Sequence, residues 1–265
     1  GLLWNRIITI GGLSGSGKSL TLEQLKYNLI ECNPEENIKI LSFEFEMLST
    51  DQIARKMTSE INRDMKDLYS ARDTKLAEDE LKSVVNLGEK LKQHPIFYVD
   101  HSCSVSQIRE TVLNFTKREE IKKNNTGLVI TIDHILLTKG GKTNEEKAKI
   151  DKLCSLAIEL KKWFKANGMK VLIIMASQLN RDIKSAERVL KSKLHYPKDS
   201  DLFGASSIMH ASDMIIICHR PSLVEGITAY GPNNLPLTHE GRDMIYWHVI
   251  KNRFYKPVIL TMIEN

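Results

Sequence analysis

The stretch GGLSGSGKS, from Gly11 to Ser19, holds four glycines and three serines within nine residues. It follows the apolar run RIITI and precedes LTLEQLKYNLI, which has the pattern of a helix. Without Cβ atoms, consecutive backbone N–H groups can turn inward around an anion, and the N-terminal end of the following helix adds a partial positive charge. The stretch therefore predicts a loop that holds phosphate groups.

The spacing from Gly12 to Ser19 matches G-x-x-x-x-G-K-[ST], the phosphate-binding P-loop. In this motif the lysine reaches the β- and γ-phosphates of a nucleotide, and the hydroxyl after it binds Mg²⁺. ATP and Mg²⁺ are therefore the expected ligands, and a chance glycine loop is the alternative. The residues expected to contact them are Ser14, Gly15, Ser16, Gly17, Lys18, Ser19 and Leu20.

A P-loop site needs a second magnesium contact, an acidic residue at the end of an apolar strand. Asp133 ends the run GLVITID, and Asp100 ends the shorter run IFYVD. We favour Asp133 because its run is longer and more apolar. Asp100 would then be a turn residue or a helix N-cap, which requires no chemistry.

Hydrolysis also needs a group that orients the attacking water. Glu44 and Glu46 lie two residues apart in ILSFEFEM, which would place both on one face of a strand, and either could act as a general base. Gln178 closes the run IIMASQ, where its carboxamide could donate to a γ-phosphate. The alternative is that Gln178 is only a polar surface residue at the end of its strand.

The apolar runs predict an α/β fold with a mostly parallel central sheet, because continuous Ile- and Val-rich runs suit strands that are covered on both faces. A helix is expected between Glu145 and Ala166, capped by Asn167-Gly168, and MIYWHVI with PVILTMI suggest a C-terminal antiparallel pair. The predicted parallel strands are Arg6–Ile10, Ile38–Phe43, Ile96–Val99, Leu128–Ile132, Val171–Ala176 and Met214–Cys218.

Composition limits the class of protein without choosing a function. The 265 residues include 38 Lys and Arg against 33 Asp and Glu, so the net charge of +5 permits a polyanionic partner but does not require one. Cys32, Cys103, Cys154 and Cys218 form no CxxC pair, so neither a disulfide framework nor a zinc site is expected, and the cytoplasm is the expected compartment. No apolar run has the length of a membrane span.

The motifs SFEFEMLSTDQIARKM, LVITIDHILL, IMASQLNR and HVIKNRFYKPVIL occur in the order found in DnaB-type replicative helicases, which the chain resembles from Gly1 to about Met262. The resemblance implies a single RecA-like ATPase domain over residues 1–265, without the family's N-terminal primase-interacting domain and linker helix. It further implies a hexameric ring that hydrolyses ATP, moves 5′ to 3′ on single-stranded DNA and unwinds the duplex. Primase and a helicase loader would be partners through regions outside this chain.

The resemblance also assigns roles to single residues. Glu46 matches the catalytic glutamate, because it precedes Met as in the family motif, and Gln178 matches the phosphate-sensing glutamine. Lys251 and Arg253 match basic residues that reach the ATP site of the neighbouring subunit, where a planar cation would stabilise charge on the transferred phosphoryl group. Arg220 resembles a family arginine close to the nucleotide.

Two long polar loops are expected, at Thr138–Asn144 and at about Asp182–Ser200. The basic segments there, Thr138–Lys149 and Arg181–Lys198, are expected to contact DNA, at the positions where RecA-like rings carry the loops that line the central channel. Contacts to the strand's phosphates need exposed cations rather than a surface that reads bases. A solvated, disordered loop is the alternative, and Tyr196 would either stack on a base or pack against the base of its loop. His195 is read as a core or surface residue. The expected DNA-binding residues are Lys139, Lys142, Arg181, Lys184, Arg188, Lys191 and Lys193.

Three features depart from the family pattern. Asp133 is followed by His134, Ile135, Leu136 and Leu137, where the family commonly has Tyr-Leu-Gln-Leu. SDLFGASSIMHASD lacks the usual Arg and Glu after its Asp-Leu and the acidic pair further on, and the N-terminal domain is absent. The first two affect how DNA contact would be coupled to ATP, and the third affects ring formation. Such departures suit a phage- or plasmid-encoded relative.

Three other functions are compatible with a P-loop. A recombinase-like or circadian-clock-like ATPase would assemble on DNA or protein without unwinding. A small-molecule kinase would need a lid and an acceptor pocket, and the sequence shows neither. A regulatory or loader-binding ATPase without hydrolysis would follow if Glu46 were misplaced.

Overall fold

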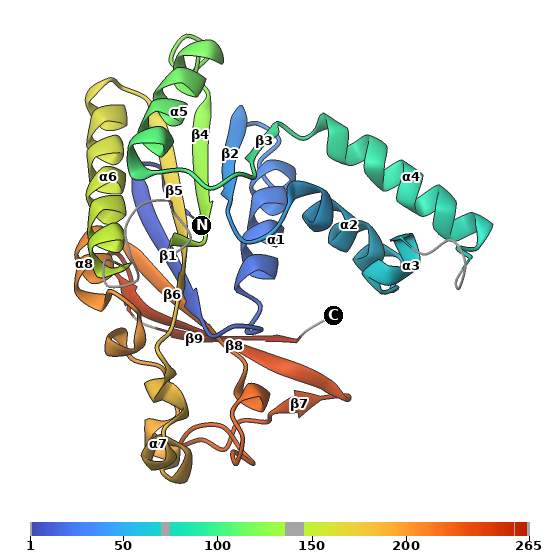
Figure 1. The fold of residues 1–265 in the computed structure, drawn as a ribbon, viewed down its shortest axis with the longest axis vertical. Helices are drawn as coiled ribbons and strands as arrows, with labels where there is room; N and C mark the ends of the chain where they lie inside the picture. The colour runs from blue at the N-terminus through green and yellow to red at the C-terminus, as the bar shows by residue number, and fades with distance from the viewer. Residues whose placement is uncertain (1, 70–74, 136–145, 257, 264–265) are drawn as a thin grey trace.

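The computed structural model describes residues 2–69, 75–135, 146–256 and 258–263 of the chain (Figure 1). Its centre is a sheet in the order β3-β2-β4-β5-β1-β6-β8-β7, with β9 paired to β8. Strands β1 to β6 pair in parallel, whereas β7, β8 and β9 join by antiparallel pairing. The strands are β1 (Arg6–Gly12), β2 (Ile38–Glu44), β3 (Ile96–Val99), β4 (Gly127–Asp133), β5 (Lys170–Gln178), β6 (Met214–His219), β7 (Thr238–His239), β8 (Arg242–Asn252) and β9 (Val258–Ile263).

The predicted α/β fold is confirmed, and the strand boundaries differ from the prediction by at most two residues at either end. The C-terminal pair is also confirmed, because β8 and β9 are antiparallel neighbours. The helix predicted up to Ala166 ends there, and Gly168 after it has φ 69°, the left-handed conformation that suits a C-terminal cap.

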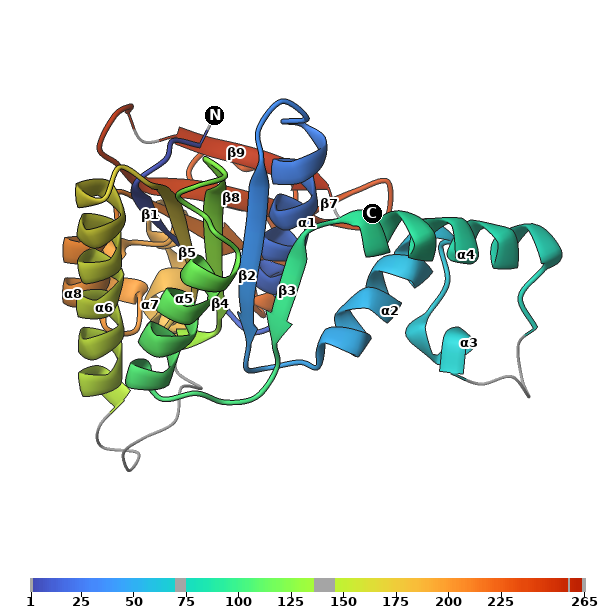
Figure 2. The same ribbon diagram turned by 90° about the horizontal axis from the view of Figure 1, so that it is seen from above.

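Helices cover both faces of the parallel strands. α5 (Val105–Arg118), α6 (Glu146–Ala166) and α8 (Ala205–Ala211) bury their apolar residues on one face, and α1 (Lys18–Glu31) covers the other (Figure 2). Successive side chains of a strand point to opposite faces, so Ile173 of β5 joins the first core while Ile174 joins the second. Burial on both sides explains why these strands appear as continuous apolar runs.

A helical arm extends from the edge of the sheet that carries β3. It consists of α2 (Ser49–Glu60), α3 (Met65–Tyr69) and α4 (Glu78–Gln93), and Figure 2 shows α4 running away from the body of the domain. α4 packs beside α2, where a Cβ added at Gly88 would lie 3.3 Å from Met57. None of the helices within the described ranges is long and apolar enough to cross a membrane.

The segment after β5 differs from its prediction. Residues 182–200 were expected to form a long polar loop, but the chain folds there into α7 (Ala186–Leu190) and the short 3-10 helices η3 (Arg181–Lys184), η4 (Ser192–Leu194) and η5 (Asp199–Asp201). Its base is closed by a bridge between Leu179 and Leu202. The second predicted loop, 138–144, lies outside the described residues.

Candidate nucleotide site

The predicted P-loop, Asp133 and Gln178 lie at the edge of the sheet formed by the carboxyl ends of the parallel strands. The last residue of β1, Gly12, lies opposite Gln178 of β5 on one side and Cys218 of β6 on the other. Glu44 at the end of β2 lies opposite Asp133 at the end of β4. Ligands of open parallel sheets bind outside this edge, so the topology alone favours a site here.

The P-loop has the backbone that its glycines predict. Gly15 and Gly17 have φ of 76° and 89°, and Gly17 is the N-cap of α1. A Cβ at Gly12 would lie 2.3 Å from the Ser16 hydroxyl, so the loop can fold this tightly only on glycine. That hydroxyl is buried and has no hydrogen-bond partner among the described residues. With the first-turn amides of α1, which lack intrahelical acceptors, it forms a cradle for an anion.

Lys18 lies between the P-loop and the acidic residues of the site. Its side chain is buried, and Nζ donates a hydrogen bond to the Leu13 carbonyl oxygen at 2.9 Å. Burial lowers the pKa of the Lys18 ammonium, while the charges of Asp133 and Glu46 act in the opposite direction. The predicted phosphate-binding lysine and two predicted acidic residues therefore lie within electrostatic range of one another.

Asp133 has the surroundings of a magnesium-side carboxylate. Its side chain is only 3% exposed, and burial raises the pKa of the carboxyl to about 6, although the side chain of Ser19 hydrogen-bonds it and acts in the other direction. Oδ1 is buried without a hydrogen-bond partner in the described part of the chain. Mg²⁺ is commonly held by one or two protein oxygens together with phosphate oxygens, and Ser19 with Asp133 fits that set.

The alternative aspartate has a different environment. Asp100 is exposed at the end of β3 and accepts a hydrogen bond from the Ser49 hydroxyl at 2.9 Å. β3 is the outermost strand at its end of the sheet and is separated from β1 by β2, β4 and β5. The position of Asp100 therefore favours the choice of Asp133.

The two glutamates after β2 have separate environments. Glu44 is buried and accepts hydrogen bonds from Lys26 Nζ, at 2.8 Å, and from the Gln52 carboxamide. Glu46 is exposed, and its charge raises the pKa values of Lys18 and Asp133. β2 ends at Glu44, so the alternation that was expected to place both residues on one face does not extend to Glu46. This geometry favours Glu46 as the residue that faces a nucleotide.

His134 is a site residue that the sequence analysis did not assign. Its buried imidazole hydrogen-bonds the side chain of Gln178 and lies close enough to Glu46 for that charge to raise its pKa against the stronger lowering effect of burial. His134 thus connects the two residues predicted to handle water and γ-phosphate. Its position directly after a strand-end aspartate was the available signal, but it was read only as a departure from the family pattern.

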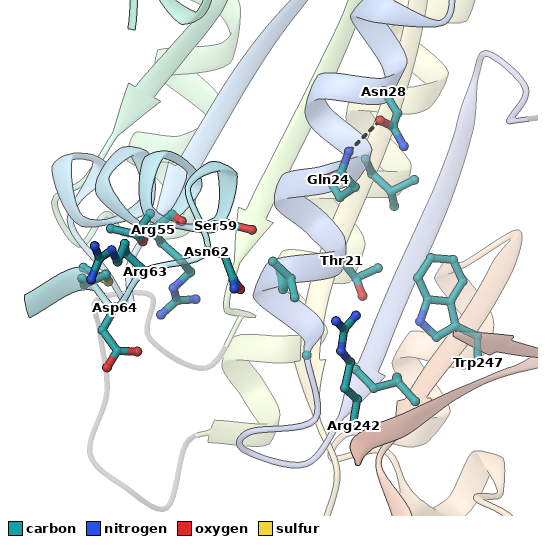
Figure 3. A pocket seen from close by; sticks show the side chains of 16 residues that line it. Thr21, Gln24, Asn28, Arg55, Ser59, Asn62, Arg63, Asp64, Arg242 and Trp247 are labelled. Atoms are coloured by element: carbon teal, nitrogen blue, oxygen red, sulfur yellow. Dashed lines mark hydrogen bonds between the residues drawn. The ribbon is translucent and has the colours of Figure 1, made fainter. Parts of the chain in front are cut away.

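A cavity of about 890 Å³ opens beside the N-terminal end of α1 (Figure 3). One wall is the surface of α1 from Gly17 through Leu20 and Thr21, and the facing walls come from α2, the turn before α3, and β8. β8 lies close to the P-loop, because a Cβ at Gly17 would be 3.0 Å from Ile245. Figure 3 shows Arg242 and Trp247 of β8 beside the first turns of α1. The cavity continues outward from the phosphate cradle.

The family model described as DnaB-like helicase C terminal domain matches residues 1–253. The chain belongs to this family. Its fold is similar to a solved structure described as an ATPase domain, with TM-score 0.70 and 18% identity over 97% of this chain and 80% of that one. It is also similar to "The Structure Of A DnaB-Like Replicative Helicase And Its Interactions With Primase", with TM-score 0.68 and 18% identity over 97% of this chain and 54% of that one. No curated protein matches the sequence.

In this DnaB-like domain the predicted trans-acting pair lies far from the P-loop of its own chain. Lys251 is opposite Ile215, near the start of β6, whereas β6 reaches the P-loop at its other end. Lys251 Nζ donates to the Met209 carbonyl oxygen, and Arg253 donates to Asp213 at 3.0 Å. Ile245 of β8 lies beside Gly17, and Lys251 is six residues further along the same strand. Because a strand rises about 3.3 Å per residue, Lys251 lies roughly 20 Å along β8 from the residue that contacts the P-loop.

Arg220 lies at the P-loop end of β6 in the DnaB-like domain. Its guanidinium donates to Asp243 of β8 at 2.7 Å. The short helix that follows, η6 (Pro221–Leu223), reaches the P-loop, because a Cβ at Gly15 would be 3.6 Å from Leu223. This position is compatible with the prediction that Arg220 lies near the nucleotide. In this structure the guanidinium of Arg220 forms an ion pair with Asp243.

The predicted DNA-binding residues of the segment 181–201 have two different environments. Arg181, Lys184, Lys191 and Lys193 are exposed. Arg188 is buried, and its guanidinium donates to Asp201 at 2.6 Å and to the carbonyl oxygens of Leu194 and Tyr196. We therefore correct the prediction for Arg188, since its cation holds the segment together and does not face solvent. Lys139 and Lys142 lie outside the described residues.

Proposed function

We propose that this chain is the ATP-hydrolysing motor of a ring-forming replicative DNA helicase, which moves 5′ to 3′ along single-stranded DNA and unwinds the duplex as a hexamer. The observation that carries the proposal is the meeting of the P-loop, Asp133, Glu46 and Gln178 at one sheet edge in a DnaB-like domain. Primase and a loader are proposed as partners through other parts of the protein, and the cytoplasm as its compartment.

ATP binding is assigned to the P-loop and the cavity beside it. The backbone from Ser14 to Ser19, with the Lys18 ammonium, would hold the phosphates. The ribose and base would extend along α1 past Leu20 into the cavity, where Arg242 and Trp247 offer a planar cation and an aromatic surface. This assignment gives each chemical part of the nucleotide a matching surface.

Hydrolysis would use the acidic residues around Lys18. Ser19 and Asp133 would hold Mg²⁺, which supplies a positive charge to the β- and γ-phosphate oxygens. Glu46 is exposed and free of the ion pair that occupies Glu44, so it can accept a proton from an attacking water. Gln178 would contact the γ-phosphate, with His134 holding its carboxamide.

A neighbouring subunit would complete the site. Lys251 lies far along β8 from the residue that contacts its own P-loop, and Arg253 follows the end of that strand, so a role in hydrolysis requires a second copy of the chain. The exposed cations Arg181, Lys184 and Lys191, with their neighbour Lys193, would contact phosphates of one DNA strand, and Lys139 and Lys142 are proposed to join them.

The test combines ATP turnover with DNA unwinding. We expect turnover to require Mg²⁺ and to rise with single-stranded DNA, and a forked duplex with a 5′ tail to be separated. Lys18→Ala should abolish turnover, with Lys90→Ala, an exposed lysine of α4, as the matched control. DNA-stimulated turnover without strand separation would instead favour a RecA-like or clock-like ATPase. Unchanged turnover in Lys18→Ala would refute the site.

A further inference from the structure

A buried cluster of rings connects the segment 181–201 to the strand that ends beside the P-loop. It combines side chains from that segment, from β6, from β8 and from the loop between them, and its rings pack with centroid distances from 5.0 to 6.5 Å. The members are His195, Tyr196, His219, Tyr230, Tyr246 and His248.

The segment enters the cluster through two consecutive residues. The ring of Tyr196 lies 5.1 Å from Tyr230 and 5.0 Å from His248, and it packs so closely on Gly231 that a Cβ there would come within 2.0 Å of it. His195 Nδ1 accepts a hydrogen bond from the Gly231 N–H at 3.1 Å. The segment is therefore held by both ring packing and a backbone contact.

The other side of the cluster leads directly to the P-loop strand. His219 is the last residue of β6 and lies 5.1 Å from Tyr230 in a nearly stacked arrangement. Its neighbour Cys218 is paired with Gly12, the first residue of the P-loop motif. The Tyr230 hydroxyl is hydrogen-bonded to His248 Nε2 at 2.9 Å, which fixes the central ring on β8.

The cluster leaves little freedom between the segment and β6. Tyr230 and Tyr246 are fully buried, and His219 and His248 are 1% and 3% exposed. Arg188 fixes the backbone of the segment next to the cluster by donating to the Tyr196 carbonyl oxygen at 2.7 Å. Close-packed interiors transmit displacements because they do not deform continuously. The cluster is therefore a continuous packed connection between the segment that carries the exposed cations and the end of β6.

We propose that Tyr196 and His195 are positioning residues that couple DNA bound on the segment 181–201 to ATP turnover at the P-loop. The coupling runs through Tyr230 and His219 to β6. This inference rests on the proposed function, because it assumes that the exposed cations of the segment bind a DNA strand. It assigns no contact with nucleotide or DNA to the rings themselves.

The experiment compares two substitutions at one position. Tyr196→Leu removes the ring that packs on Tyr230 and His248, whereas Tyr196→Phe keeps the ring and loses only a hydroxyl that has no partner among the described residues. We expect Tyr196→Leu to keep its DNA-free turnover and its affinity for a fluorescent oligo(dT), and to lose at least about fivefold in stimulation by oligo(dT), the lower range of coupling between two sites. Tyr196→Phe should behave as the wild type.

Unchanged stimulation in Tyr196→Leu would overturn the inference, as would an equal loss of DNA-free and DNA-stimulated turnover. If Tyr196→Leu does not fold, His195→Phe removes the acceptor for Gly231 and keeps a ring, and it should lose stimulation in the same way while His195→Asn retains it. A wild-type protein whose turnover ignores oligo(dT) would refute the proposed function itself, which separates that failure from failure of the coupling alone.

Discussion

Glu44 and Glu46 show how two identical side chains at neighbouring positions take on different physical tasks. Glu44 is buried beside Lys26, which is itself buried and also paired with Glu23. Removing one partner of a buried ion pair leaves the other charge uncompensated in a medium of low polarity. The loss of Glu44 should therefore destabilise the folded protein. Glu46 has no such ion pair within the described part of the chain, and its charge raises the pKa values of Lys18 and Asp133.

Amide substitutions should therefore affect different properties at the two positions, ATP turnover at Glu46 and stability at Glu44. Glu46→Gln should lower ATP turnover by about 10²–10⁴-fold, the usual contribution of a general base, with no change in the urea midpoint of unfolding. Glu44→Gln leaves Lys26 with Glu23 alone and should lower the free energy of unfolding by about 3 kcal/mol. Steady-state kinetics and urea titration of both variants provide the measurement. A large loss of stability in Glu46→Gln would contradict this division of roles.

The positions of residues that belong to a motif could be predicted from the sequence, whereas positions that depend on an unexpected neighbour could not. The P-loop and Asp133 could be predicted because their spacing places them at strand ends. Arg188 was misassigned because a basic segment gives no sign of which cation turns inward toward Asp201. His134 was missed because its contact with Gln178 joins two strand ends that the sequence does not align.

At the scale of elements, β8 runs from the candidate nucleotide site to the cations proposed to act on a neighbouring subunit. Ile245 lies against Gly17 of the P-loop, and Arg242 and Trp247 line the cavity beside α1 (Figure 3). Lys251 is near the far end of the same strand. A paired strand is stiff, so β8 holds the candidate nucleotide site and Lys251 of one chain at a fixed separation. Lys251 is in turn proposed to act on the nucleotide site of the next subunit.

Arg253→Ala tests the proposed role of this far end. Asp213 keeps two other partners, the Lys161 ammonium at 3.0 Å and the Ile7 N–H at 2.9 Å, so the fold should persist. We expect nucleotide affinity to change little and turnover to fall by about 10³-fold, as for other arginines that act on a neighbouring site. Lys161→Ala, which removes another cation from Asp213, is the matched control and should keep its turnover. An equal loss of binding and hydrolysis in Arg253→Ala would indicate a structural role.

Elements covered on both faces were predictable, whereas the folded segment after β5 was not. A strand such as β5 buries consecutive aliphatic residues, which leaves a clear sequence pattern. The segment 181–201 is instead held by His195, Tyr196 and Arg188. Residues of these types are often found on protein surfaces, so their presence in a sequence does not indicate burial. Its short helical turns are also too brief to show helical periodicity.

At the scale of the whole molecule, the ring cluster links stability to pH. Burial, together with repulsion from His248 and Arg188, lowers the pKa of His219 to about 3, and burial lowers the pKa of His248 to about 4. Both imidazoles are therefore neutral in the folded protein and take up protons near pH 6.5 when the chain unfolds. The unfolded state binds more protons below that pH, so stability must fall as the pH drops from about 6.5 toward 4.

His219→Phe should reduce this dependence on pH. Each of the two imidazoles costs about 2 kcal/mol of unfolding free energy between pH 7 and pH 5, so removing one should halve their combined loss. Neither ring nitrogen of His219 has a hydrogen-bond partner in the described part of the structure. Phenylalanine should therefore also maintain stability at pH 7 or raise it by about 1 kcal/mol, because an unsatisfied buried polar group is removed. Urea titrations at both pH values measure the two effects, and a variant that loses as much stability as the wild type between them would show that His219 is not a buried neutral imidazole.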